Sequence, residues 1–101
     1  MENKNKSWWI YLVLCGDGTL YCGIARDVER RMADHATAKG SRYVRAHGGV
    51  DKVQWRYETI SRSAAQRIEA WIKRLSRQEK INLSEGKVSI PAELEDELRD
   101  Q

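Results

Sequence analysis

Five side chains with complementary chemistry stand within the first 69 residues of the chain. They are two phenols, a guanidinium, an imidazole and a carboxylate: Tyr11, Tyr21, Arg31, His35 and Glu69. A guanidinium can bind a phosphate group through two hydrogen bonds. An imidazole can donate a hydrogen bond or shuttle a proton, and one carboxylate can hold a hard cation while water and phosphate complete its coordination. Gathered in one place, these groups could act on a phosphodiester.

The two phenols would need positive charge beside them. An unperturbed pKa of about 10 makes tyrosine a poor base near neutral pH. The phenol becomes useful when nearby positive charge favours the phenolate, or when it only orients a water molecule. Arg31 and a bound cation are the groups best placed to supply that charge. The alternative is that both tyrosines are ordinary strand residues, because aromatic residues are common in strands.

Arg31 and His35 lie one turn apart on a predicted helix, beside its apolar stripe. In this position they could bind a phosphate together. The alternative is a solvated helix face, on which Arg31 would pair with Asp27 four residues earlier.

Glu69 stands four residues after Ala65 and three before Ile72, both candidates for the core. This spacing places its carboxylate at the edge of a buried helix face, where it could hold a cation such as Mg²⁺. The alternative is an exposed pair with Lys73, worth a few tenths of a kcal/mol.

Residues 8–15 and 19–25 alternate between apolar and other side chains around the turn residues 16–18, which predicts a β-hairpin with one apolar face. That face would hold Ile10, Leu12, Leu14, Leu20, Cys22 and Ile24.

The length of the hairpin loop decides where the tyrosines point. A three-residue loop, with Gly18 in the left-handed region, pairs Val13 with Tyr21. Tyr11 and Tyr21 then share the face opposite the apolar set, away from the core. A two-residue loop would scramble the faces, which is costly where one face is buried. We therefore expect the three-residue loop.

A helix and a third strand should follow the hairpin. Asp27 is a suitable N-cap for a helix that runs to about residue 38, and residues 52–60 alternate as a strand does. The inner stripe of the helix would be Val28, Met32 and Ala36. In the strand, one face would hold Val53, Trp55 and Tyr57, and the other Gln54, Arg56 and Glu58.

The pattern becomes helical again from Ser63. Apolar side chains at helical spacing are Ala64, Ala65, Ile68, Trp71, Ile72 and Leu75. The capping-box pattern over residues 76–79 predicts another helix, which Gly86 would end. One more short helix could follow Pro91, with Leu94 and Leu98 as its apolar contacts.

Residues 39–45 form a basic segment with an aromatic side chain inside it. Such a segment fits contacts to a nucleic-acid backbone with some stacking on a base. The candidate contacts are Lys39, Arg42, Tyr43 and Arg45. The alternative is an ordinary surface loop.

Charge is unevenly distributed along the chain. The formal net charge is +3, but residues 87–101 hold two basic and five acidic side chains, a balance of −3, which leaves +6 on the rest. A basic body with an acidic tail suggests a polyanionic partner. The alternative is simply a charged, soluble surface.

The length of 101 residues predicts a single domain with a modest core. Apolar stretches are too short to span a membrane, and the polar start does not resemble a secretion leader. The hairpin register would put Cys15 and Cys22 on opposite faces, which argues against a disulfide. A reducing cytoplasm is the expected location.

Taken in order, these pieces resemble the GIY-YIG nuclease superfamily, and most closely its small stand-alone bacterial members. The segments Trp9-Ile10-Tyr11 and Tyr21-Cys22-Gly23 match the two words of the family name. Further matches are residues 24–35 after the second word, 39–45 in the small branch and 68–76 in the metal-binding helix. The expected nuclease domain covers residues 8–86, between a flexible N-terminus over 1–7 and an acidic tail over 87–101.

The resemblance implies an α/β fold of the α+β kind, with a small three-stranded, mostly antiparallel sheet flanked by helices. It also implies phosphodiester hydrolysis with one divalent ion, Mg²⁺ or Mn²⁺. By that likeness Glu69 is the metal ligand and Arg31 steadies the scissile phosphate. Tyr11 takes a proton from the attacking water, Tyr21 positions the water or the phosphate, and His35 supports Tyr11 or the phosphate.

Two positions depart from the family words. Cys22 replaces an isoleucine, which is conservative for a core position. Trp9 replaces a glycine on the face of Tyr11, where it could narrow the substrate cleft or stack on a nucleotide.

The leading hypothesis is therefore a DNA endonuclease of low sequence specificity that works in DNA repair or processing. Branched, nicked or single-stranded DNA would be its substrates, and a protein partner could supply specificity. The alternative is a nucleic-acid-binding module without catalysis, for DNA or RNA. A third possibility is a small interaction protein whose acidic tail docks on a partner.

Overall fold

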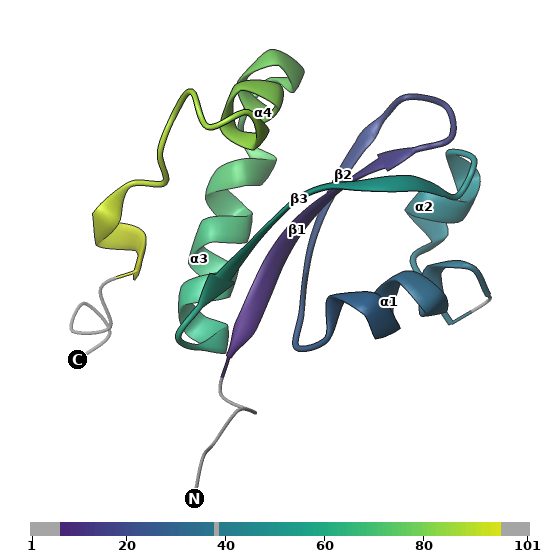
Figure 1. Ribbon diagram of the computed structural model, residues 1–101, viewed down its shortest axis with the longest axis horizontal. Coiled ribbons are helices and arrows are strands. Elements are labelled where there is room, and N and C mark those ends of the chain that lie inside the picture. The colour runs from purple at the N-terminus through teal and green to yellow at the C-terminus, as the bar shows by residue number, and fades with distance from the viewer. Residues whose placement is uncertain (1–6, 38, 96–101) are drawn as a thin grey trace, which may run out of the picture.

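The computed structural model describes residues 7–37 and 39–95. Its elements in chain order are β1 (Trp8–Cys15), β2 (Leu20–Ala25), α1 (Val28–His35), α2 (Arg42–Ala46), β3 (Val50–Thr59), α3 (Arg62–Lys73), α4 (Arg77–Ser84) and the 3₁₀ helix η2 (Ala92–Glu95). The strands form one antiparallel sheet in the order β2-β1-β3. Helices α1 and α2 lie on one side of this sheet, and α3 and α4 on the other (Figure 1). This arrangement confirms the predicted small α+β fold.

The β-hairpin has the predicted three-residue loop. Val13 pairs with Tyr21 across β1 and β2, and the backbone N–H of Cys15 donates to the carbonyl of Thr19 at 2.8 Å. Gly18 closes the loop with a φ of 89°, a left-handed conformation that is strained for residues with a side chain. The register therefore places Tyr11 and Tyr21 on the same face of the sheet.

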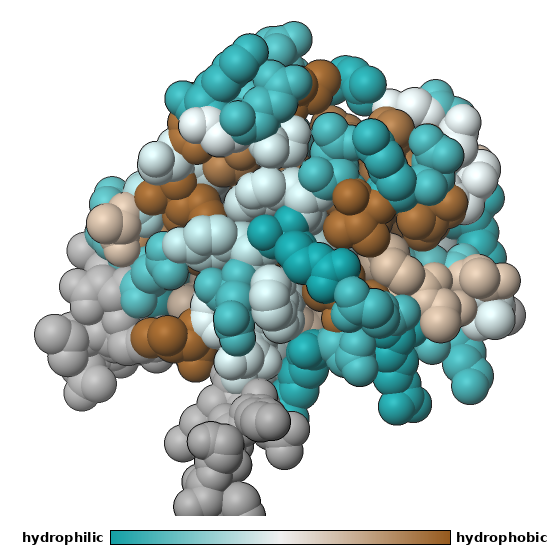
Figure 2. Space-filling model, in the orientation of Figure 1, coloured by the Kyte–Doolittle hydropathy of each residue, from teal (hydrophilic) through white to brown (hydrophobic). Residues whose placement is uncertain are grey.

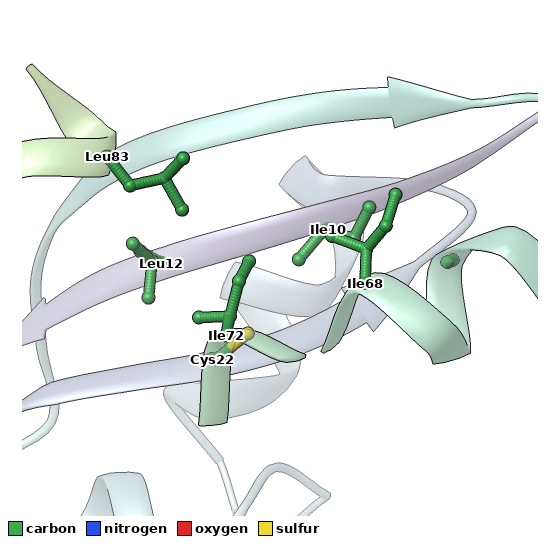
Figure 3. Close-up of a cluster of buried hydrophobic side chains, with 7 residues drawn as sticks. Ile10, Leu12, Cys22, Ile68, Ile72 and Leu83 are labelled. Atoms are coloured by element: carbon green, nitrogen blue, oxygen red, sulfur yellow. The ribbon is translucent and has the colours of Figure 1, made fainter. Parts of the chain in front are cut away.

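One face of the sheet carries an aliphatic core beneath α3 and α4. Its buried members are Ile10, Leu12, Cys22, Ala65, Ile68, Ile72 and Leu83. Figure 3 shows Ile68 and Ile72 of α3 directed at Ile10, Leu12 and Cys22 of the hairpin. Burying a side chain of this kind stabilises the fold by about 1.5–3 kcal/mol.

The tyrosine face is a second core, which corrects the prediction that it lies away from the core. Tyr11 is only 1% exposed and packs with Val13, Cys15, Val28 and Val44. The prediction failed because alternation assigned a single apolar face, whereas α1 and α2 supply Val28 and Val44 to cover the other one. Cys15 and Cys22 lie in different cores and are free thiols, as the register predicted.

Strand β3 does not keep Val53, Trp55 and Tyr57 on one face, contrary to the prediction. The pairing of β3 with β1 is irregular between Leu12 and Val13, which pair with Trp55 and Val53. The residue between them is bulged, and a bulge reverses the direction of the side chains that follow. Val53 consequently packs in the tyrosine core, while Trp55 and Tyr57 pack on the aliphatic core.

Helix α1 begins at the predicted N-cap but is shorter than expected. The side chain of Asp27 accepts from the backbone N–H of Arg30 at 3.1 Å. The helix ends at His35, and Ala36 is its exposed C-cap, so the predicted inner position of Ala36 is wrong. His35 takes its place on the buried face with Val28, seven residues away and therefore two turns along the same side.

The C-terminal elements follow the sequence signals. Ser76 and Glu79 form both hydrogen bonds of a capping box at the start of α4. The predicted helix after Pro91 is η2, and Leu94 packs against the aliphatic core. Tyr57 also donates to the carboxylate of Glu95 at 2.7 Å, which ties this segment to β3. The predicted contact of Leu98 falls outside the described residues, as do residues 1–6 of the N-terminus 1–7 that was expected to be flexible.

Apolar residues on the face seen in Figure 2 form several separate patches among hydrophilic ones. Within residues 7–37 and 39–95, no helix has both the length and the apolar character needed to cross a membrane.

Candidate active site

Tyr11 and His35 form a buried hydrogen-bonded pair. The hydroxyl oxygen of Tyr11 lies 3.2 Å from Nε2 of His35, and the backbone N–H of Ser41 donates to Nδ1 of the same ring at 3.1 Å. Because Nδ1 accepts, the neutral ring carries its proton on Nε2. His35 therefore donates to the oxygen of Tyr11 and leaves that hydroxyl free to donate elsewhere.

Gly23 lets the ring of Tyr11 reach the edge of the sheet. The two residues are direct partners across β1 and β2, and a Cβ atom at position 23 would overlap the hydroxyl of Tyr11. Since β2 is an edge strand, the hydroxyl lies over the border of the sheet and not over its middle. Gly23 of the Tyr21-Cys22-Gly23 segment thus leaves the space that the ring of Tyr11, from the Trp9-Ile10-Tyr11 segment, occupies.

Both members of the pair are uncharged at neutral pH. Burial raises the pKa of Tyr11 to about 12, although the hydrogen bonding and charge of Arg31 act in the opposite direction. Burial also lowers the pKa of His35, and the charge of Arg31 adds to this effect. Arg31 thus acts on the phenol in the expected direction, but in the protein alone burial outweighs it.

A row of aromatic rings runs from this pair to the surface. The ring of Tyr21 lies 6.4 Å from Tyr11 and 6.0 Å from His35, measured between centroids. Tyr43 stacks on Tyr21 at 5.4 Å, and His47 follows at 4.2 Å from Tyr43. Tyr43 is 43% exposed, so the row leads from a buried phenol to an accessible ring.

Sequence reasoning missed His47 and its partner. Nδ1 of His47 lies 2.6 Å from a carboxylate oxygen of Asp17, which joins α2 to the hairpin loop. The spacing of Tyr43 and His47, one helical turn, was the available signal. It was overlooked because the segment was expected to be a basic stretch and not a helix capped by Ser41.

The predicted basic contacts belong to α2, which also carries Tyr43, and to the loop before it. Val44 is fully buried and anchors α2, while Arg42 and Arg45 on the same helix are exposed. Lys39 is exposed in the preceding loop. Hence these three cations are accessible, unlike the buried pair, and lie close to Tyr43 along the chain.

Arg31 lies at the rim of the site. Its side chain is 33% exposed and approaches Asp34 at 3.8 Å. The alternative pairing with Asp27 is wrong, because that carboxylate caps the helix instead. A long ion pair of this kind between partly exposed groups is worth little, so it holds the guanidinium only weakly away from a phosphate.

Glu69 belongs to α3, on the other side of the sheet from α1. Its carboxylate pairs with Lys73 at 3.2 Å, which is the pairing considered as the alternative to a metal site. It is also close enough to Cys22 of β2 for its charge to contribute, after burial, to raising the pKa of that thiol to about 12. No hydrogen bond among the described residues joins Glu69 to the tyrosines. Glu69 therefore lies at the border of β2, separate from the hydrogen-bonded pair of Tyr11 and His35.

The residues present nevertheless fit a single cation with few protein ligands. In the described part of the chain, no three His, Cys, Asp or Glu side chains gather into a metal-binding group. Mg²⁺ needs no such cage, because it keeps several waters and is held by one or two carboxylates with substrate phosphate. The Glu69 side chain is 22% exposed and Lys73 is 54% exposed, so among the described residues the ionic competitor of a cation is a partly exposed pair, of a kind worth about 0.3–0.5 kcal/mol.

Trp9 lies on the tyrosine face, as predicted from its spacing. It packs against the tyrosine core, and the guanidinium of Arg56 lies over its ring at 5.8 Å. Arg56 also pairs with Glu29 of α1 at 2.8 Å. The large ring that replaces the family glycine is thus bridged to α1 through one arginine.

Known proteins share this chain's sequence and fold. The model of the GIY-YIG catalytic domain matches residues 7–82. A UPF0213 protein of Vibrio cholerae is 39% identical over 83 residues, 82% of each chain, and one of Cronobacter sakazakii is 38% identical over 87 residues, 86% of this chain and 90% of the other. The solution NMR structure of the UPF0213 protein of Bacillus halodurans has a TM-score of 0.52 and 34% identity, and it covers 87% of this chain and 92% of that one. The chain therefore belongs to the GIY-YIG nuclease superfamily.

Proposed function

We propose that this protein is a metal-dependent endonuclease that hydrolyses DNA phosphodiester bonds with low sequence specificity. The observation that carries the proposal is the hydrogen-bonded series Ser41–His35–Tyr11, which ends on a phenol oxygen at the edge of the sheet. A buried histidine held by a backbone N–H has no evident packing purpose, because an apolar side chain would fill the space at lower cost. Its arrangement suits the control of a proton on Tyr11.

Tyr11 accepts a proton from the attacking water in this proposal. The phenolate is the reactive form, and the Nε2–H of His35 and the guanidinium of Arg31 are the groups of this chain that stabilise it. Since burial keeps the phenol protonated in the protein alone, its deprotonation depends on the positive charge of a loaded site. Each turnover then returns the proton from Tyr11 to solvent.

Arg31 and Tyr21 act on the phosphate. Arg31 is partly exposed and weakly paired, so it can stabilise the charge that develops on the scissile phosphate. Tyr21 contacts both Tyr11 and His35 through its ring and positions the water or the phosphate beside them. Phosphoryl transfer depends mainly on such positioning and charge stabilisation.

Glu69 is the residue that would hold the cation, Mg²⁺ or Mn²⁺. When bound, the cation would supply positive charge to the phosphate and lower the pKa of a coordinated water. The lone carboxylate and its exposed lysine partner support one ion with substrate completing its coordination.

The substrate is proposed to be DNA in a branched, nicked or single-stranded form, and Lys39, Arg42, Tyr43 and Arg45 would contact it. Backbone contacts without base readout predict binding that is weak and strongly dependent on salt. Specificity would then come from DNA shape or from a protein partner. We place this activity in the cytoplasm, in DNA repair or processing, with residues 8–86 as the nuclease unit and the acidic segment 87–101 outside it.

The test is cleavage of branched, nicked, duplex and single-stranded DNA, and of RNA, with Mg²⁺ or Mn²⁺. Glu69→Ala should abolish cleavage, and Lys73→Ala is the matched control, because it removes the ion-pair partner and leaves the carboxylate. Cleavage that survives Glu69→Ala would overturn the metal assignment. Isothermal titration of Mn²⁺ into both variants measures metal binding independently of activity.

A nucleic-acid-binding module without catalysis is the second candidate. Two observations favour it: the carboxylate of Glu69 is already paired with Lys73, and Tyr11 is a neutral phenol and therefore a poor base. Under this alternative the protein binds DNA or RNA, cleaves neither with any metal, and takes up no Mn²⁺ at Glu69.

A further inference from the structure

Two arginines from distant parts of the chain lie over one tryptophan ring. The guanidinium carbons of Arg26 and Arg62 are 5.3 Å and 5.4 Å from the centroid of Trp8. Arg26 directly follows β2, Arg62 opens α3, and Trp8 opens β1. These three elements meet at one end of the sheet, at the bottom of Figure 1. We name this group the Trp8 clamp.

The two cations of the Trp8 clamp have no ionic partner among the residues that the structure describes. Both arginines are exposed, and no carboxylate within residues 7–37 and 39–95 forms an ion pair with either. Arg56 is a useful contrast, because it lies over Trp9 but also pairs with Glu29 at 2.8 Å. Two like charges held at one ring without a counter-ion suit the binding of an anion from outside the chain.

Contact with the ring also prepares the guanidiniums for binding. A cation over an indole face gains about 0.5–1 kcal/mol at an exposed site. This contact restricts a side chain that otherwise loses about 2 kcal/mol of rotamer entropy when it is fixed. The N–H groups at the edge of each guanidinium remain available, and their planar fork matches two oxygens of a phosphate.

The Trp8 clamp lies on a path that passes the candidate active site. On α3, Arg62 precedes Glu69 by seven residues, which is two turns along the same side of the helix. On the sheet, Arg26 follows Gly23 by three residues, and Gly23 lies beneath the hydroxyl of Tyr11. Both routes lead from the clamp along the border of β2 to the proposed site.

We propose that the Trp8 clamp binds a backbone phosphate of the nucleic-acid strand that enters the active site, several nucleotides from the scissile bond. The strand follows the edge of β2 between the clamp at one end and the basic end of α2 at the other. Six residues of β2 span about 20 Å at about 3.3 Å each, which is about six nucleotides of a duplex strand at about 3.4 Å each. The direction of this path depends on the proposed function, but binding at the clamp does not depend on cleavage.

Binding measured without metal tests the clamp separately from the chemistry. Fluorescence anisotropy of labelled duplex and single-stranded DNA, in EDTA and over a range of salt concentrations, gives both the affinity and its salt slope. Arg26→Gln and Arg62→Gln should each lower the affinity several-fold and reduce the slope by about one phosphate contact. Arg62→Lys keeps the charge, so it should retain the slope while losing affinity, because it lacks the planar fork.

Lys52→Gln is the matched control. It removes one exposed positive charge from β3, the strand at the opposite edge of the sheet from β2. A change in slope equal to that of the arginine variants would mean general charge attraction and would overturn the clamp. Unchanged binding of both arginine variants would overturn it as well, and thermal unfolding confirms that each variant is folded. Vesicles with anionic headgroups provide a second ligand: if they bind through Arg26 and Arg62 and DNA does not, the clamp is a lipid site and the proposal is wrong.

The outcomes separate this proposal from the proposed function. If the wild-type protein cleaves DNA but the arginine variants bind it like wild type, only the clamp fails. If no substrate is cleaved but both arginine variants still reduce the salt dependence of DNA binding, the clamp is confirmed and the protein is a nucleic-acid-binding module without catalysis.

Discussion

The sheet has two buried faces that differ in chemistry. Beneath α3 and α4 the buried side chains are aliphatic, with Cys22 as the exception, and partly buried aromatic side chains pack around them. Beneath α1 and α2, the apolar side chains surround Tyr11 and His35, which are 1% and 2% exposed and bound to each other. Burying a hydroxyl and an imidazole requires a hydrogen-bond partner for each, and the backbone of Ser41 supplies the last one.

This difference suggests that one face of the sheet mainly provides stability and the other mainly provides the candidate site. Replacing a polar pair by apolar residues of similar shape is often neutral or stabilising, so the tyrosine face is not built for stability alone. The aliphatic face carries the stability, and the other face retains polar groups at the edge of β2. Substitutions on the two faces should therefore separate stability from activity.

The largest effect is expected for Tyr11→Phe. Loss of a group that transfers a proton lowers a rate by about 10²- to 10⁴-fold, and we expect cleavage to fall by this amount. Stability should change by about 1–3 kcal/mol, because the hydroxyl loses its hydrogen bonds with His35 and Arg31. Steady-state cleavage rates and urea unfolding measure the two quantities.

Tyr57→Phe is the matched control for Tyr11→Phe. It also removes a phenol hydrogen bond, to Glu95, but on the aliphatic side of the sheet. It should leave cleavage unchanged. Equal losses of activity in the two variants would show that the tyrosine face has no special role.

Leu83→Ala should produce the converse result. Leu83 is 3% exposed in the aliphatic core, and truncation of a buried leucine costs about 2–5 kcal/mol. Urea unfolding should show this loss, while the cleavage rate per folded molecule stays constant. Val88→Ala, at a position 43% exposed, should lose much less stability. Loss of activity in folded Leu83→Ala would contradict the division between the faces.

Gly23→Ala tests the close contact at the border of β2. Its Cβ would overlap the hydroxyl of Tyr11, so the ring must move. Overpacking of this kind costs about 1–3 kcal/mol of stability. We expect cleavage to fall by more than this loss of stability explains, because the phenol leaves its position beside His35. Activity equal to wild type at full folding would show that the position of Tyr11 is unimportant.

The smallest effect is the pH dependence of stability that His35 causes. Burial lowers the pKa of His35 in the folded protein, so below the unfolded value of about 6.5 the unfolded chain binds a proton that the folded protein excludes. Its contribution to the free energy of unfolding is therefore complete above pH 6.5 and decreases as the pH falls towards the folded pKa. Urea unfolding at pH 7.5 and 5.5 should show a smaller decrease in His35→Gln than in wild type. His47→Gln, at a partly exposed histidine, is the control, and an equal decrease in wild type and His35→Gln would show that His35 titrates normally.

Local signals predicted much of the fold. Alternation and the Gly16-Asp17-Gly18 loop were sufficient to establish the register of the hairpin, and Ser76 with Glu79 established the start of α4. Local signals failed to predict the fold where a segment distant in the sequence determined the structure. The bulge in β3 moved Val53 to the other face from Trp55, and no alternation pattern contains a bulge.

The candidate site was predicted in part for the same reason. The chemical types and spacing of Tyr11, Tyr21 and His35 were visible, and the structure brings these three rings together. Asp17 and His47, thirty positions apart, were not connected by any local pattern. The partnership of Trp8 with Arg26 and Arg62 was equally hidden, because its members belong to three elements.

The sequence by itself determined that Tyr11 and Tyr21 share a face, because strand alternation and loop length depend only on neighbouring residues. Tertiary structure alone decided that this face is buried, since the covering side chains come from α1 and α2. It thereby decided that Tyr11 rests as a neutral phenol with a pKa of about 12, because desolvation depends on everything packed around a group and not on its neighbours in the chain.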